Sequence, residues 1–168
     1  LAVDSGHPFP FLTNHTINAI VRIFQIQPDG TKDYKIAILP IPSVLDRIIE
    51  IPSRGNKEHR FVYLEDVITY YANQFFQGYG IEDYMVFRIT RDADLEIDEE
   101  EATDLLSEVE ASLRRRRRGD AVRLEVCGEV KDNLLDFVLT SVELEPKDVY
   151  RIDGHLDCRM YFDFCNYP

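Results

Sequence analysis

The sequence predicts an α+β domain, in which one mixed β-sheet is packed by about three to four helices. Two patterns alternate along the chain: apolar runs rich in β-branched residues, typical of strands, and apolar residues at helical spacing. Two strands come first, followed by an irregular stretch and then by strands and helices in turn, which favours a mixed sheet. A length of 168 residues with 45% hydrophobic residues suits a substantial core. We therefore expect residues 1–168 to form a single domain.

The first two strands form a predicted hairpin. Thr16–Ile26 is a nearly continuous apolar, β-branched run, as expected of a strand buried on both faces. Gln27–Gly30 follows with Pro and then Asp-Gly, which is a turn signal because Pro presets φ and Gly accepts a positive φ. Tyr34–Ile41 resumes the strand pattern, so the two strands are expected to pair.

The central stretch is less regular. Val44–Ile49 is expected to be a short helix or a single turn, and Phe61–Leu64 a short strand. Glu65–Phe76 is a predicted helix that ends before Gly78, and Asp83–Thr90 is the next strand. The apolar stripe of this helix is expected to consist of Leu64, Val67, Ile68, Tyr71 and Phe75.

The C-terminal half continues the alternation. Asp98–Arg118 is a predicted helix with a capping-box start, and Lys131–Val142 is another. Ala121–Cys127 alternates as a half-buried strand, with Val122, Leu124 and Val126 on one face and Arg123 and Glu125 on the other. Val149–Asp153 is expected to be a short strand, and Leu156–Phe164 a final helix.

Charge and composition exclude several classes of protein. The 19 basic and 31 acidic residues give a net charge of -12, which repels polyanions and argues against a nucleic-acid binder. No apolar run is long enough to span a membrane and no signal peptide is visible, so we expect neither in this chain. The three cysteines lack disulfide or zinc spacing, so a cytoplasmic setting is expected. The chain begins at Leu1 rather than Met, and we expect it to be a piece of a longer protein.

Arginines near a strand end are the first candidate site. Arg88 and Arg91 lie three residues apart, so they are expected to point to opposite faces of the strand, one structural and one functional. A guanidinium suits phosphate or a carboxylate, and Arg123 and Asn14 are further candidates for contacting phosphate or a partner. The alternative is internal pairing with nearby acids, namely Asp92, Asp94 and Glu96.

The N-terminal arm is the second candidate. Pro8, Phe9, Pro10 and Phe11 alternate rigid prolines with aromatic rings, and such a strip loses little entropy on docking. It is expected either to bind another domain or to cover the core of this one, and the two roles are compatible.

No catalytic residue and no metal site can be assigned. The four histidines show no paired metal spacing, and the phosphate-loop, dinucleotide and nucleophile-elbow motifs are absent. Arg114–Arg118 reads as a helix C-terminus more readily than as a phosphate patch, since five residues exceed one turn. Asp98–Glu101 reads as a capped, solvated helix start rather than a cation site.

Five blocks, in order, resemble the middle (head) domain of the bacterial polyphosphate kinases that make long-chain polyphosphate. They are His7–Asn14, Phe61–Ile68, Phe87–Glu96, Ala121–Val126 and Val149–Gly154. The resemblance implies a parent enzyme of four domains that moves the terminal phosphate of ATP onto polyphosphate through a phosphohistidine, with Mg²⁺. Its catalytic motifs belong to C-terminal domains that are absent here, so neither ATP nor Mg²⁺ is expected as a cofactor of this chain.

The resemblance also implies partners and a location. The head domain is associated with dimer contacts and with enclosing the active-site tunnel, so the expected partners are the other domains of the enzyme and a partner subunit. The enzyme is expected in the cytoplasm, or associated with the membrane as a full-length protein. The expected role is scaffold and subunit contacts without catalysis by this chain alone. Two alternatives are a phosphate- or nucleotide-binding module using Asn14, Arg88 and Arg91, and a dimerisation module without a ligand.

Overall fold

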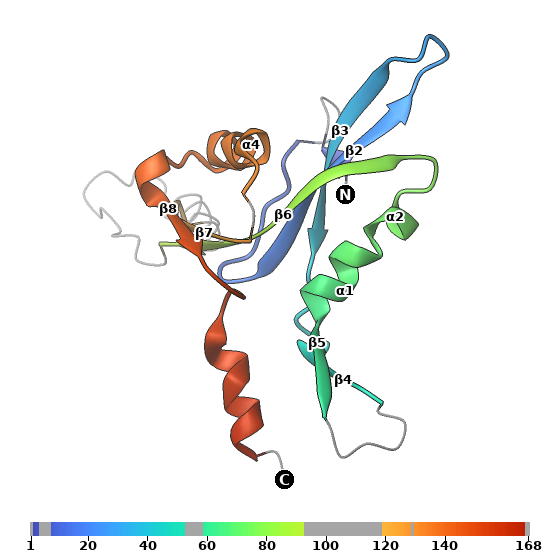
Figure 1. Ribbon diagram of the computed structural model, residues 1–168. Coiled ribbons are helices and arrows are strands. Elements are labelled where there is room, and N and C mark those ends of the chain that lie inside the picture. Colours follow the sequence, from blue (N-terminus) through green and yellow to red (C-terminus); the bar gives the residue numbers. More distant parts are fainter. Residues whose placement is uncertain (1, 4–7, 53–58, 93–118, 129, 167–168) are drawn as a thin grey trace, which may run out of the picture.

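A computed structural model describes the chain except residues 1, 4–7, 53–58, 93–118, 129 and 167–168, and of residues 2–3 and 163–166 only the backbone. Its main sheet has six strands in the order β1-β3-β2-β6-β7-β8 (Figure 1). The strands are β1 (Ala2–Val3), β2 (Ile17–Ile26), β3 (Lys32–Pro40), β6 (Gly80–Arg91), β7 (Ala121–Cys127) and β8 (Val149–Ile152). All neighbours pair antiparallel except β7 and β8, which are parallel. The predicted α+β fold with a mixed sheet is confirmed.

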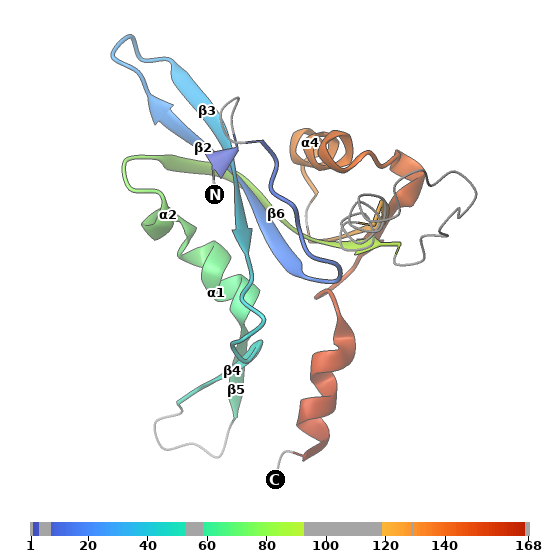
Figure 2. The same cartoon turned by 180° about the vertical axis from the view of Figure 1, so that it is seen from behind.

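The predicted hairpin of β2 and β3 is confirmed and projects beyond the rest of the sheet (Figures 1 and 2). Gly30 takes the positive φ of 85° that its turn requires. The carboxylate of Asp29 accepts hydrogen bonds from the main-chain N–H and the hydroxyl of Thr31. These local bonds satisfy the turn where the hairpin is most exposed to water.

The two faces of the sheet are covered differently. Helix α4 (Asp132–Val142), as predicted from its periodicity, lies over β2 and β6 and buries its apolar stripe there. The opposite face carries a second core cluster, formed by Ile17, Ala19, Ile41, Leu64, Val86 and Leu156. Helix α1 (Leu64–Tyr70) lies on this side, after a small hairpin of β4 (Ile48–Ile51) and β5 (Arg60–Tyr63).

The structure corrects two predictions in the central stretch. The end of Val44–Ile49 is not helical, because Ile48 and Ile49 begin strand β4 after a turn. The helix predicted over Glu65–Phe76 is broken at Tyr71 into α1 and α2 (Ala72–Phe75). The predicted stripe is wrong in part, because Tyr71 and Phe75 are exposed while the polar side chains of Glu65 and Thr69 are buried.

The C-terminal half brings further corrections. In β7, Val122 is 46% exposed and Glu125 is buried, the reverse of the predicted alternation at those positions. The last helix is a 3-10 helix, η3 (Cys158–Asn166), and it begins two residues later than expected. A short 3-10 turn, η2 (Pro146–Asp148), precedes β8. The helix predicted over Asp98–Arg118, with its run of five arginines and its acidic start, lies outside the described residues.

Candidate functional site

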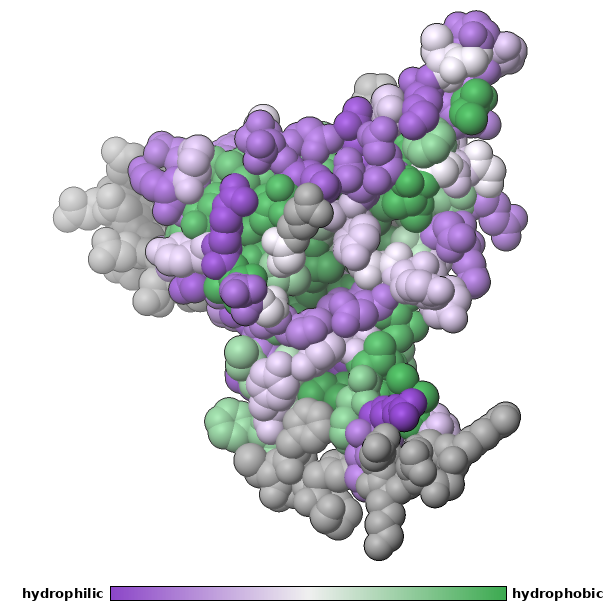
Figure 3. All heavy atoms as spheres, in the orientation of Figure 1, coloured by the Kyte–Doolittle hydropathy of each residue, from purple (hydrophilic) through white to green (hydrophobic). Residues whose placement is uncertain are grey.

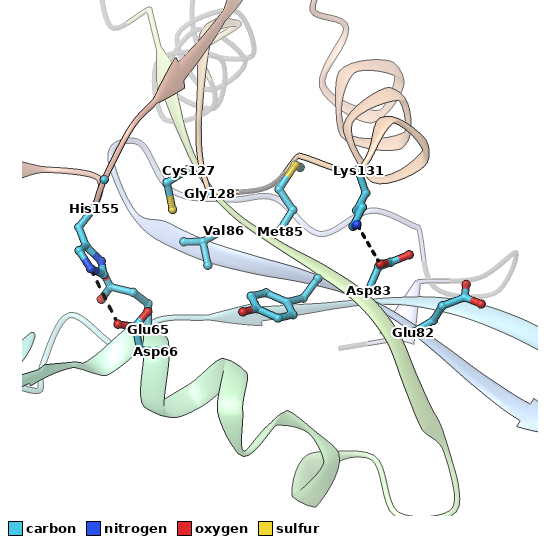
Figure 4. Close-up of a pocket in the computed structure, with 12 residues that line it drawn as sticks. Glu65, Asp66, Glu82, Asp83, Met85, Val86, Cys127, Gly128, Lys131 and His155 are labelled. Carbon is cyan, nitrogen blue, oxygen red and sulfur yellow. Dashed lines mark ion pairs between the residues drawn. The ribbon is translucent and has the colours of Figure 1, made fainter.

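A groove with a volume of about 460 Å³ lies on the second face of the sheet, between α1, β6 and the segment that follows β8 (Figure 4). It is lined by the apolar residues Met85 and Val86 of β6, and acidic side chains border it. Lys131, at the start of α4, lies 3.9 Å from Asp83 across one end. A second pocket of about 420 Å³ adjoins the groove at His155. It is lined by His15, Arg88, Glu125, Ile152, His155, Leu156, Asp157, Cys158 and Arg159.

The deepest charged group beside the groove is Glu65, whose side chain is only 2% exposed. It lies in the first turn of α1, where the helix dipole favours an anion. Arg47 donates hydrogen bonds from Nε to both carboxylate oxygens, at 3.0 and 3.1 Å. The chain brings the two together because the main-chain N–H of Leu64 donates to the carbonyl oxygen of Arg47, at 2.8 Å. A buried carboxylate requires such a partner, since an isolated buried charge is costly.

His155 lies between the aromatic and acidic residues of this region. Its ring stacks on Tyr63, with centroids 3.5 Å apart. Its Nδ1 is 3.4 Å from Glu65, and its Nε2 is 3.8 Å from Asp66 (Figure 4). Burial raises the pKa of the Asp66 carboxyl above its ordinary value, although the charge of His155 opposes this.

Two other titratable groups here are held in their protonated forms. The Tyr63 and Tyr161 hydroxyls are hydrogen-bonded at 2.7 Å, and this bond, with burial, raises the pKa of Tyr63 to about 12. Burial raises the pKa of the Cys127 thiol to about 11. A thiolate is the nucleophilic form of cysteine, so Cys127 does not have the environment of a catalytic nucleophile.

Arg88, one of the predicted site residues, lies at the boundary of the second pocket in a set of ion pairs. Its Nε is 2.5 Å from Glu125, and its Nη1 is 3.2 Å from Asp157. Arg159 pairs with the same aspartate at 2.6 Å. The hydrogen bond from Arg159, helped by the charges of both arginines, lowers the pKa of Asp157 to about 2. We refer to Arg47, Glu65, Arg88, Glu125 and Asp157 as the buried ionic cluster; their side chains are each at most 16% exposed.

Arg123 joins the edge of this cluster. Its Nη2 is 2.9 Å from Glu125, and its guanidinium lies 4.0 Å from the centre of the Tyr150 ring. Its Nε is the one buried side-chain nitrogen or oxygen among the described residues that has no hydrogen-bond partner. The pairing of β6 with β7 brings Arg88 and Arg123 to the same carboxylate, Glu125, which sequence reasoning did not select as a site residue.

The other two predicted site residues, Arg91 and Asn14, lie together elsewhere, where the N-terminal arm crosses the end of β6. Asn14 exchanges two hydrogen bonds with the main chain of Arg91, at 2.9 and 3.2 Å. The Arg91 side chain donates to the carbonyl oxygens of Leu12 and Gly119, at 3.0 and 2.9 Å. Burial lowers the pKa of Arg91, but an arginine stays charged in proteins.

The rest of the arm is divided between core and surface. Phe9 packs against Phe137 of α4, with ring centroids 6.1 Å apart, and contributes to the core on that face. Phe11 is 47% exposed, with the Arg91 guanidinium 4.5 Å from the centre of its ring. Pro8 is exposed and Pro10 half-buried. The arm therefore covers the core in part and also presents an aromatic ring to solvent.

The charged side chains around both pockets and the N-terminal arm are largely paired within the chain. The arginines named above have carboxylate, carbonyl or aromatic partners within the chain. Among the described residues, no group of three or more His, Cys, Asp or Glu side chains could hold a metal ion. Sequence reasoning missed Arg47, Glu65, His155 and Asp157. The one available signal was the spacing of Glu65 and Thr69, which places both on one face of α1, and that face is buried.

Comparison with known proteins gives a consistent result. The family model described as "Polyphosphate kinase middle domain" matches residues 1–164. The polyphosphate kinase of Halalkalibacterium halodurans is 41% identical over 167 residues, covering 99% of this chain and 23% of that protein. That of Bacillus cereus is 40% identical over 164 residues, covering 96% of this chain and 23% of that protein. The crystal structure of polyphosphate kinase from Porphyromonas gingivalis matches with a TM-score of 0.68 and 21% identity, over 92% of this chain and 21% of that one. The chain thus spans about a quarter of the length of these relatives.

A separate observation concerns membranes. Among the described residues, no helix combines the length and the apolar character that a membrane span requires.

Proposed function

This chain belongs to the polyphosphate kinase middle-domain family, and from that premise we propose that it is the scaffold and subunit-contact domain of an ATP:polyphosphate phosphotransferase. The whole enzyme would transfer the terminal phosphate of ATP to polyphosphate, reversibly, through a phosphohistidine in a different domain. The chain would therefore be part of an enzyme while being inactive alone. The match to a middle domain over residues 1–164 is the observation that carries this proposal.

Mg²⁺ and ATP, in this proposal, bind to other domains of the parent enzyme. The described residues offer no cluster of metal-ligating side chains. The acidic groove would repel a nucleotide's phosphates, because Glu65, Asp66, Glu82 and Asp83 all border it. The fit of this chain's own described residues to a Mg–nucleotide complex is therefore poor.

The internal pairing of the candidate arginines supports a scaffold role. Arg88 is neutralised by two carboxylates, and Arg91 binds main-chain carbonyls of the arm and of the segment before β7. Arg123 shares Glu125 with Arg88. To bind phosphate, each would have to give up contacts that hold the fold together. A domain with a net charge of -12 is also a poor main surface for a polyanion.

An activity assay tests whether the chemistry lies outside this chain. The isolated chain and the full-length parent enzyme are each incubated with ATP and Mg²⁺, and polyphosphate is measured. We expect synthesis by the full-length enzyme and none by the chain. Robust turnover by the isolated chain would place the chemistry inside residues 1–168 and overturn the proposal.

Calorimetry with ATP and with short polyphosphate tests the phosphate-binding alternative. We expect no binding in the micromolar range by the isolated chain. Micromolar binding that Arg91→Ala abolishes, in a variant whose circular dichroism is unchanged, would instead favour a phosphate-binding module. Ultracentrifugation of the full-length enzyme, which we propose to be cytoplasmic, tests the proposed subunit contacts. We expect an oligomer, and a monomer would contradict those contacts.

A further inference from the structure

Two structural legs extend from the second face of the sheet, one made of η3 and the other of α1 with the small β4–β5 hairpin (Figures 1 and 2). The exposed large apolar side chains on and beside these legs include Val44 (89%), Leu45 (55%), Tyr161 (43%) and Phe162 (73%). We refer to these four residues as the exit surface. Figure 3 shows hydrophobic side chains over both legs, below a body whose visible outer rim is largely hydrophilic.

The two halves of the exit surface are neighbours in space. Leu45 and the first turn of η3, through Arg159, line the same pocket of about 240 Å³. The floor of this pocket is apolar, with Ile17, Ile41 and Leu64. The hydrogen bond between Tyr161 and Tyr63 attaches η3 to the end of β5. These two contacts place the segments that carry the four side chains next to each other, on the side of the sheet that bears the second core cluster.

The exposed apolar side chains of the exit surface indicate that another protein surface binds there. Single apolar side chains are common on protein surfaces, but a group of large ones next to a pocket marks an interaction site. Val44, in the turn that precedes β4, is the most exposed of the four, at 89%. Burial of such groups on docking is favourable by about 25 cal/mol for each Å² of apolar area.

The position of this surface in the chain identifies the occupant. The family is described as a middle domain, and the chain covers 23% of its relative from Halalkalibacterium halodurans, so the relatives have most of their length outside the matched segment. Helix η3 is the last described element, and it leads away from the sheet beside the exit surface (Figure 1). A domain tethered at this point would have a high effective concentration at the exit surface.

We propose that the exit surface binds an apolar face of the domain that follows this one in the same polypeptide. This inference rests on the proposed function, because it takes the chain to be the middle part of a polyphosphate kinase. It goes further by assigning the contact to Val44, Leu45, Tyr161 and Phe162. The contact is intramolecular, so it forms within one subunit and does not depend on protein concentration.

Footprinting with hydroxyl radicals provides the first test. The isolated chain and the full-length enzyme are labelled under the same conditions, and modification of Phe162 and Leu45 is compared with that of Ile26. Ile26 is 66% exposed at the end of β2, at the far end of the molecule from the legs, and serves as the matched control. We expect at least fivefold protection of Phe162 and Leu45 in the full-length enzyme at every dilution, and no change at Ile26.

Substitution provides the second test. Val44→Ser with Phe162→Ser is expected to lower the unfolding temperature of the full-length enzyme and to speed proteolysis after residue 168, while Ile26→Ser changes neither. In the isolated chain, both sets should leave the unfolding temperature unchanged, which separates lost docking from lost folding. The polyphosphate assay of the same full-length samples reports the proposed function independently.

Two results would overturn the inference. Equal labelling of Phe162 in the isolated chain and the full-length enzyme would show that nothing covers the surface. Protection that appears in the isolated chain as its concentration rises would assign the surface to a second copy. Neither result bears on the proposed function, which the polyphosphate assay of the full-length enzyme tests separately.

Discussion

Arg47 donates a hydrogen bond from Nη1 to the main-chain oxygen of Asp157, at 2.8 Å, across a sequence separation of 110 residues. The same guanidinium holds the buried carboxylate of Glu65. One side chain thus joins the turn before β4, the first turn of α1 and the segment between β8 and η3. Arg47 thus connects the two legs of the domain near their start, and the Tyr63–Tyr161 hydrogen bond connects them further along.

Removal of the Arg47 guanidinium is expected to lower the free energy of unfolding. Arg47→Met leaves Glu65 buried without its guanidinium partner, with only His155 nearby, and breaking a buried pair costs about 3–5 kcal/mol in unfolding free energy. Urea denaturation measures this loss. Replacing both partners, as Arg47→Met with Glu65→Leu, should recover most of it. The exposed pair of Glu50 and His59 is the control, where Glu50→Gln should cost less than about 1 kcal/mol.

Asp157 should make stability depend on pH at the acidic end. Its pKa is about 2 in the folded chain, against an ordinary value near 3.8, so its contribution is fully present above about pH 4 and is lost as pH falls towards 2. Asp157→Asn should flatten the slope of unfolding free energy between pH 4 and pH 2. Asparagine tolerates the left-handed φ of 56° at this position.

Control measurements make the acid prediction specific. Asp136→Asn removes a carboxylate from an exposed position of α4, and its slope over the same window should match that of the unmodified chain. A slope for Asp157→Asn that is also unchanged would show that the pairing with Arg88 and Arg159 does not contribute to stability.

Arg91 is expected to hold the N-terminal arm in place. Arg91→Ala removes bonds to Leu12 and Gly119, and charged hydrogen bonds of this kind contribute about 1.5–3 kcal/mol. Limited proteolysis should cut the arm faster in this variant, and urea denaturation should show the loss of stability. Arg151→Ala, on the exposed side of β8, should change neither. An arm that remains resistant in Arg91→Ala would contradict this role.

Gly119 is expected to tolerate no side chain. A Cβ built on Gly119 would collide with the main-chain oxygen of Asp92, at the point where Asp92 bonds back to Asp120 at 2.9 Å. Gly119→Ala should therefore cost about 1–3 kcal/mol, as overpacking does. Gly30→Asn is the comparison, because open space surrounds that glycine and asparagine accepts its positive φ. Equal melting temperatures for the two variants would argue against the close approach.

The elements were predictable where a local pattern decided them. The β2–β3 hairpin followed from an apolar run and a turn signal, and α4 from the spacing of Leu134, Leu135, Val138 and Leu139. The break at Tyr71 could not be predicted, because the apolar spacing of Glu65–Phe76 continues across it. Neither Pro nor Gly, the residues that most often end a helix, lies between residues 65 and 76 to mark the break.

The site was less predictable than the fold. Arg88 and Arg91 were selected because they flank a strand end, but their partners come from residues 12, 119, 125 and 157, which no local pattern associates with them. Glu65 suited an exposed first turn equally well on sequence grounds. Only the fold places Arg47 beside it, and burial of a charge depends on that partner.

The parallel pairing of β7 and β8 determines the direction in which the polypeptide leaves the sheet. Ile152 is registered opposite Cys127, so both strands finish at the same end. The eleven residues of α4 reverse the chain to make this possible. With β8 antiparallel, the chain would depart at the other end, beside Arg91 and the N-terminal arm. The polarity of this one short edge strand therefore fixes the side of the domain at which η3 begins.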